Sequence, residues 1–299
     1  EPVSGLRAFS LSPGGPLSGL GLRDRLPVFL GAGDGPLANL GSGASSVGAI
    51  NIDLGTSGAA RAICDTAVTD DQGSLWCFCL TDKLWAYGGI VTNVDNAYEW
   101  LGTKVLGEDA SRAYDRMNGL AAAIAPGADG LLVLPYLRKA RSPYWDGRLK
   151  GTIYGLTPDH GAGHIARALL EAIGYDLRTI LGLMAARIDT RPEIVFTGGL
   201  ARSPLMPHLL ADILEREIRT PENQEGSIAG AAIMALKGLG AIDDLSFSAS
   251  SAAAYRSFAP EVEHSAVYRG AYARYAALVE AMRRIEIDSH RSLHSGSRS

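Results

Sequence analysis

A long amphipathic segment followed by a short apolar run and a glycine-rich turn constrains the fold of this chain most. Between residues 162 and 187, apolar residues recur every three or four positions, which predicts a helix with one buried face. Residues 193–196 then predict a strand, and Thr197–Gly199 predict a tight turn before a second helix that Ser203 is suited to cap. Helix, strand and helix in close succession favour an α/β or α+β fold.

The rest of the chain predicts the same mixture of elements. We expect strands over 28–31, 49–54, 75–80 and 84–87, a buried strand or apolar loop over 130–136, and helices over 95–106, 109–124, 203–216, 225–239 and 266–285. The strands near 28–31, 49–54, 75–79 and 193–197 are expected to share one sheet. Residues 1–26 are rich in Gly, Pro and Ser and are expected to be a linker or the remnant of a preceding domain. Residues 27–286 would form the domain, and 287–299 a disordered tail.

The composition is that of an ordinary soluble globular protein. Hydrophobic residues make up 46% of the chain and charged residues 20%. The net charge of −4 gives no reason to expect binding to nucleic acid or to an anionic membrane. No apolar run reaches the roughly 18 residues of a membrane-spanning helix. Three cysteines, Cys64, Cys77 and Cys79, are too few for a disulfide framework and suit a cytoplasmic protein, with buried thiols expected rather than a metal site.

Two glycine-rich turns and one acidic residue are the candidate functional features. Residues 55–58 and 197–199 each follow an apolar run, and backbone amides in such turns can approach an anion. Neither turn has the spacing of a Walker or dinucleotide-binding loop, so two tight turns without a ligand are the default interpretation of these residues alone. Asp34 lies in the glycine-rich stretch 31–41. An aspartate there can form the turn or serve as a general base, and the residue types leave both roles open.

Four segments in this order resemble the C-terminal domain of the FGGY family of carbohydrate kinases. The segments are Gly31–Gly41; Asp53–Ala59 with Arg61; Pro135–Leu137 with Arg141–Asp146 and Gly151; and Phe196–Pro204 with Pro221, Glu222 and Glu225–Ala232. The string GDGPLANLG followed by LGTSGA is most similar to the gluconokinase branch of the family, with xylulokinase-like enzymes next.

The resemblance implies an actin-like ATPase fold, with a ribonuclease-H-like mixed sheet flanked by helices. It also implies phosphorylation of a sugar or sugar-acid hydroxyl by ATP, with Asp34 as the catalytic base. The residues that match the family's ATP-binding turns are Gly55, Thr56, Ser57, Gly198, Gly199, Leu200 and Ser203. Magnesium would arrive with ATP, with no dedicated metal-binding residues. The run from 225 to 232 is expected to serve close helix packing.

The chain departs from the family pattern in three places. The family carries a preceding domain with a first phosphate loop and most sugar-binding residues, and neither is found in this sequence. Asn93–Asn96 replaces the usual Asn-Gly-Gly, so Asp95 would repel ATP unless it turns outward or meets a cation. Lys139 and Ala140 stand where relatives usually have Gly-Glu, which weakens the match around Arg141.

These departures define the alternatives. The main expectation is the C-terminal half of a gluconate-type kinase that acts with a missing N-terminal domain. The alternatives are a non-catalytic remnant or association module of the same fold, and a xylulokinase-like enzyme. A homodimer is left open, and the sequence does not name the sugar.

Overall fold

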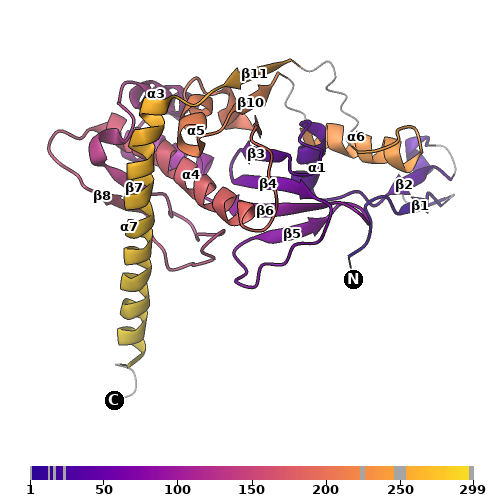
Figure 1. Cartoon of the computed structure of the whole chain (residues 1–299), viewed down its shortest axis with the longest axis horizontal. Helices are drawn as coiled ribbons and strands as arrows, with labels where there is room; N and C mark the ends of the chain where they lie inside the picture. Colours follow the sequence, from indigo (N-terminus) through magenta and orange to yellow (C-terminus); the bar gives the residue numbers. More distant parts are fainter. Residues whose placement is uncertain are drawn as a thin grey trace.

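The computed structural model describes residues 2–12, 14–15, 18–22, 25–222, 226–245 and 254–295. Within them, a seven-stranded mixed sheet runs through the centre in the order β11-β10-β9-β3-β4-β6-β5 (Figure 1). Its strands are β3 (Ile50–Leu54), β4 (Gly58–Cys64), β5 (Trp76–Cys79), β6 (Trp85–Val91), β9 (Ile194–Thr197), β10 (Ile218–Pro221) and β11 (Tyr255–Phe258). Strands β3, β9 and β10 run parallel, and the other neighbouring pairs are antiparallel.

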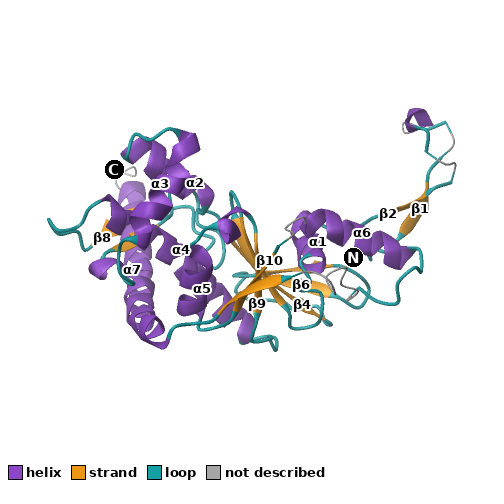
Figure 2. Cartoon of the chain, turned by 90° about the horizontal axis from the view of Figure 1, so that it is seen from above, coloured by secondary structure: helices purple, strands orange, loops and turns teal. Residues whose placement is uncertain are grey.

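Helices cover both faces of this sheet (Figure 2). One face is covered by α4 (Ala162–Ala185) and α5 (Met206–Leu214), with α2 (Asp95–Trp100), α3 (Ala110–Ala122) and α7 (Val262–Ser295) packed around them. The other face is covered by α1 (Asp34–Gly41) and α6 (Gly226–Gly238). Among the helices of the described residues, none combines the length and apolar character that a membrane crossing requires.

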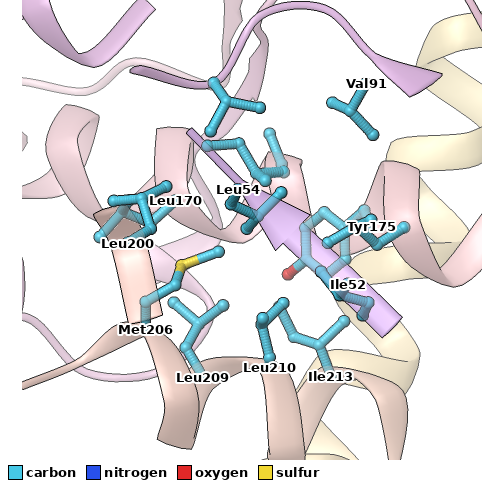
Figure 3. Close-up of a cluster of buried hydrophobic side chains, with 14 of the residues drawn as sticks. Ile52, Leu54, Val91, Leu170, Tyr175, Leu200, Met206, Leu209, Leu210 and Ile213 are labelled. Carbon is cyan, nitrogen blue, oxygen red and sulfur yellow. The ribbon is translucent and has the colours of Figure 1, made fainter. Parts of the chain in front are cut away.

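Alternation along β4 separates the two hydrophobic cores. Ala62 belongs to the large core beneath α4 and α5, and its neighbour Ile63 belongs to the smaller core beneath α1 and α6. This follows from the two-residue period of a strand, whose side chains point to opposite faces in turn. Ile52 and Leu54 of β3 lie in the large core against side chains of α4 and α5 (Figure 3).

Short elements complete the chain. They are β1 (Ala8–Ser10) paired with β2 (Pro27–Phe29), β7 (Leu132–Leu134) paired with β8 (Thr152–Tyr154), the π-helical turn η2 (Leu101–Val105) after α2, and the 3₁₀ turns η1 (Ser18–Leu20), η3 (Ala128–Gly130) and η4 (Gly199–Arg202).

Helices α1 and α6 approach one another closely because glycines line their contact. A Cβ atom at Gly41 would overlap the carbonyl oxygen of Gly226, and one at Gly230 would overlap the carbonyl oxygen of Leu37. Small residues at a crossing let two helix backbones approach in this way. The expectation of close helix packing for this run is confirmed from Gly226 onward, while Glu225 lies outside the described residues.

The strand expected near 28–31 does not join the central sheet. Strand β2 pairs with β1 in a separate two-stranded sheet that projects from the body (Figure 2). Val28 and Leu30 are about half exposed, whereas β3 and β4 are almost fully buried, so β2 lacks the two covered faces of a central strand. Residues 8–10, expected to be linker, form its partner strand.

Several elements were not predicted. The stretch around Asp34 was expected to be a turn, and the structure makes Asp34 the first residue of helix α1. Strand β4 was missed because alanine and glycine dominate it and have low strand propensity. Strands β8, β10 and β11 were also missed. Helix α7 continues to Ser295, where a tail was expected from 287 onward, and residues 296–299 lie outside the described residues.

A buried carboxyl group joins α4 to the long helix α7. Asp176 accepts hydrogen bonds from the hydroxyls of Tyr136 and Tyr275, each at 3.0 Å. Burial raises the pKa of Asp176 to about 7, and the donations from Tyr275 and Tyr136 oppose that shift. Since an unfolded aspartate has a pKa near 3.9, the folded chain holds this proton at pH values where the unfolded chain has released it.

The free energy of unfolding should therefore fall as pH rises from about 4 to about 7, by at most about 1.4 kcal/mol per pH unit for this one group. Asp176→Asn cannot ionise and should lack this component. Denaturant unfolding at pH 5 and pH 8 measures how much the free energy of unfolding changes between the two pH values. Asp159→Asn, at an exposed position, is the control. We expect Asp176→Asn to gain stability relative to the parent between these two values. A difference that stays constant would show that Asp176 does not titrate in this range.

Candidate active site at the β3–β4 hairpin

The hairpin between β3 and β4 places a tight turn beside the end of β9. The turn consists of Gly55, Thr56 and Ser57, and the amide of Gly55 donates to the carbonyl of Ser57 at 3.0 Å. Beside it, Gly198 has φ of +92°, and a Cβ there would overlap the carbonyl oxygen of Leu54. This glycine is therefore required both by its left-handed backbone and by the close approach of the two turns.

A cleft of about 470 Å³ opens beside these two turns. The two turns and the residues beside them line one side of the cleft, namely Leu54, Gly55, Gly199, Leu200 and Arg202. Helices α2 and α3 line the other side with Asp95, Tyr98, Glu99, Ala113 and Tyr114. It thus combines exposed backbone at two glycines with aromatic and apolar surface, an arrangement that suits a ligand with both a phosphate group and a ring.

Asp95 faces into this cleft, at the first residue of α2. Burial raises its pKa above the usual value, and the nearby carboxylate of Glu99 adds to the shift. The sequence left open whether Asp95 turns outward. The structure places it on the cleft wall, where its charge opposes an anionic ligand.

A second, smaller hollow of about 170 Å³ lies on the same hairpin. Its wall includes Asp34, Asp53, Ser57, Arg61 and Ser227. The exposed carboxylate of Asp34 accepts the amide of Gly35 at 2.7 Å, and the hydroxyl of Ser227 donates to the Asp34 carbonyl at 3.1 Å. Asp34 is thus fixed between α1 and α6, with its carboxylate next to the turn that also borders the large cleft.

Asp53 and Arg61 form an ion pair at the base of the hollow. The Nη2 atom of Arg61 lies 3.8 Å from Oδ2 of Asp53. Burial raises the pKa of Asp53, the Arg61 guanidinium opposes the shift, and the charge of Asp34 adds to it. For Arg61, burial lowers the pKa, and the charges of Asp53 and Asp34 raise it. The three charged groups therefore share one electrostatic environment.

The structure brings most of the expected site residues together, but not into a single cleft. Gly55, Gly199 and Leu200 border the large cleft, whereas Asp34 and Ser57 border the small hollow. The turn from Gly55 to Ser57 borders both, so the two hollows are neighbours on one hairpin.

Among the expected site residues, Thr56, Gly198 and Ser203 line neither hollow, and Ser203 is the one whose side chain has a structural role. Its hydroxyl is buried, donates to Oδ1 of Asn118 at 2.8 Å, and accepts the amides of Leu205 and Met206 at 3.2 Å each. Its residue type suggested the N-cap of the helix, but the N-cap of α5 is Leu205, and Ser203 binds the amides of Leu205 and Met206 from the preceding turn. These bonds give Ser203 a structural role away from the walls of both hollows.

The sequence did not single out Asp53, Arg61, Tyr98 and Arg202 as site residues. Asp53 and Arg61 were noted only as letters of a resembling segment. Their pairing across the β3–β4 hairpin, with Asp53 next to Gly198 in space, depends on the fold. One signal for Arg61 was available in the sequence. It is the single charged residue in the stretch of small and apolar residues that forms β4.

Comparisons with known proteins agree with this geometry. Residues 50–239 match the profile described as FGGY family of carbohydrate kinases, C-terminal domain. A gluconokinase of Bacillus subtilis is 38% identical over 232 residues, which cover 75% of this chain and 45% of the relative. A xylulose kinase of Staphylococcus epidermidis is 28% identical over 275 residues, which cover 90% of this chain and 54% of the relative.

Solved structures show the same fold. The crystal structure of gluconate kinase from Lactobacillus acidophilus superimposes with a TM-score of 0.86 at 26% identity, covering 94% of this chain and 56% of that one. The expected actin-like ATPase fold is thereby confirmed. This chain spans about half the length of the curated relatives it matches. The chain belongs to the FGGY family of carbohydrate kinases and carries its C-terminal domain.

Proposed function

We propose that this chain supplies the nucleotide-binding turns and the catalytic base of an ATP-dependent sugar kinase. The observation that carries the proposal is the shared hairpin. Its Gly55 borders the large cleft, and its Ser57 borders the hollow that holds Asp34. A nucleotide whose phosphates follow the hairpin turn would present its terminal phosphoryl group next to a carboxylate, which is the arrangement that phosphoryl transfer to an alcohol needs.

In the proposed reaction, the carboxylate of Asp34 takes the proton of the acceptor hydroxyl. The hydroxyl oxygen then forms a bond to the γ-phosphorus, while the bond between that phosphorus and the bridging oxygen of ATP breaks and ADP leaves. Gly55, Thr56, Ser57, Gly198, Gly199 and Leu200 would hold the nucleotide through backbone and hydroxyl groups. We leave Ser203 out of this set, because its hydroxyl already bonds to Asn118 and to the amide of Met206.

We propose that magnesium reaches this site with ATP. Within the described residues, no group of three or more His, Cys, Asp or Glu side chains could hold a metal ion. Asp53, whose side chain is 37% exposed and borders the hollow, is the carboxylate that could join the phosphates as a ligand. When bound, the ion would neutralise phosphate charge.

We infer that the acceptor is a sugar acid of the gluconate type. The support is the higher identity to gluconokinases, 36–38%, than to the xylulose kinase at 28%. Because the chain spans about half of these relatives, we infer that turnover requires the assembled kinase, meaning residues 1–299 together with the remaining part of the relatives' length. A non-catalytic module of the same fold is the alternative that Asp95 favours, because its charge faces the nucleotide cleft.

The test is release of ADP by the assembled kinase with gluconate, xylulose, ribulose and glycerol as acceptors. We expect gluconate to give the highest kcat/KM. Higher kcat/KM with xylulose would favour the xylulokinase-like alternative. Nucleotide binding without turnover for any acceptor would favour the non-catalytic module.

Asp95→Asn should strengthen ATP binding by residues 1–299. The substitution removes a negative charge from the cleft wall at nearly constant volume, so we expect the Kd for Mg·ATP to fall roughly threefold to tenfold, the range of a partly screened charge pair near a protein surface. Calorimetry measures this change, with Asp159→Asn as the control for loss of a surface charge. Unchanged or weaker binding in Asp95→Asn would show that the carboxylate does not oppose the phosphates.

A further inference from the structure

Arg61 is held at the base of the Asp34 hollow by contacts at both ends. Its Nε donates to Oδ1 of Asn39 at 3.1 Å, and Nδ2 of Asn39 donates back to the carbonyl of Arg61 at 3.2 Å. Asn39 is fully buried in α1, so this reciprocal pair fixes the guanidinium relative to the helix that begins with Asp34. A charged group fixed in this way is pre-organised for a ligand.

Space for the guanidinium depends on a glycine. A Cβ at Gly35 would lie 2.5 Å from Nη1 of Arg61, closer than real Cβ contacts allow. The glycine after Asp34 therefore lets the arginine reach the hollow directly beside the carboxylate.

One nitrogen of this buried guanidinium is left without a hydrogen bond. Arg61 is 5% exposed and borders the hollow, yet its Nη2 has no hydrogen-bond acceptor among the described residues. The separation of 3.8 Å from Asp53 is an ion pair without a hydrogen bond. Nη2 is itself closed off from solvent. An unsatisfied buried donor is costly, and the cost is recovered when the guanidinium turns toward a ligand oxygen in the hollow.

We propose that Arg61 is a further catalytic residue, whose guanidinium donates to an oxygen of the transferred phosphoryl group. This inference rests on the proposed function. The hollow that Arg61 borders also contains Asp34 and Ser57, so a ligand there lies between the base and the hairpin turn. Oxygens of the phosphoryl group gain charge or change position during transfer, and guanidinium groups suit them in geometry and charge.

A carboxylate of the acceptor is the other oxyanion that Arg61 could bind. The position of Arg61 favours the phosphoryl group. The acceptor hydroxyl must lie at Asp34, and the phosphoryl group must meet it there, whereas a carboxylate elsewhere on a sugar acid lies farther along the acceptor.

The test uses residues 1–299 with ¹⁵N-labelled arginine side chains and backbone. Mg·AMP-PNP carries a γ-phosphoryl group and Mg·ADP does not. We expect both nucleotides to shift the amides of Gly55 and Gly199, and only Mg·AMP-PNP to shift the Nε–H resonance of Arg61. Calorimetry should show Mg·AMP-PNP binding roughly tenfold more tightly than Mg·ADP, the effect of a good charge-assisted hydrogen bond.

Arg61→Met should remove this preference and leave the affinity for Mg·ADP unchanged. Arg178→Lys is the matched control, because Arg178 bonds to Ile213 and Glu215 away from both hollows. If Arg61→Met does not fold, as judged by circular dichroism, the resonance shifts of the unmodified chain still decide the matter.

The remaining outcomes overturn the inference in distinguishable ways. Shifts at Gly55 and Gly199 with equal Arg61 shifts for both nucleotides would refute the role of Arg61 and leave the nucleotide site standing. An Arg61 shift with gluconate alone, and not with Mg·AMP-PNP, would assign Arg61 to the acceptor carboxylate. No shift at either glycine would refute the proposed function, and the inference with it.

Discussion

The assembled kinase carrying Asp34→Asn is expected to lose roughly 10²–10⁴-fold in kcat, the usual contribution of a general base. The amide retains an oxygen that can accept the Gly35 amide, so the start of α1 should keep its geometry. It cannot take a proton from the acceptor hydroxyl. The two turns that would hold the nucleotide are unchanged, so binding of ATP should be retained.

The measurement is a coupled ADP-release assay combined with calorimetry of Mg·ATP. Asp115→Asn, on the exposed surface of α3, serves as the control for a neutralised carboxylate. A kcat within a few-fold of the parent enzyme would remove Asp34 from the reaction. A loss confined to KM for ATP would instead place Asp34 against the nucleotide.

Residues 1–299 by themselves are expected to show no detectable sugar-dependent turnover. Phosphoryl transfer needs charge stabilisation around the γ-phosphoryl group and an acceptor held in line with it. The described residues contribute the hairpin turn, the second turn at Gly198 and Gly199, and the Asp34 carboxylate. Positioning of reactants can account for about 7–11 kcal/mol of barrier lowering, so loss of an acceptor site alone removes many powers of ten in rate.

The same assay, with gluconate, xylulose, ribulose and glycerol, checks this expectation. The control is the assembled kinase at equal concentration. Acceptor-dependent turnover by residues 1–299 that disappears in Asp34→Asn would show that these residues form a complete catalyst, contrary to this proposal.

Helices that bury one face could be predicted from apolar residues that recur every three or four positions. Helix α4 spans 162–185, close to the expected 162–187, and its apolar residues lie in the large core. Helix α1 could not be predicted in this way. Its Gly, Pro and Asn residues favour a turn, and it is the close packing against Gly226 and Gly230 of α6 that holds it.

The candidate site shows the same division. Asp34 and the two glycine turns could be proposed because their local strings resemble a known family. Arg61 could not be, because its importance lies in an unsatisfied nitrogen, in the contact with Asn39 and in the space left by Gly35. These features arise only when α1 packs against β4. The placement of Asp95 on the cleft wall likewise depends on where α2 begins.

A crystal structure of residues 1–299 with Mg·AMP-PNP tests the central claim most directly. The account predicts the base and ribose in the cleft between Tyr98 and Leu200, the phosphates along the turn from Gly55 to Ser57, and the γ-phosphoryl group next to Asp34. A nucleotide bound in that cleft with its γ-phosphoryl group directed away from Asp34, or bound elsewhere on the chain, would contradict the account.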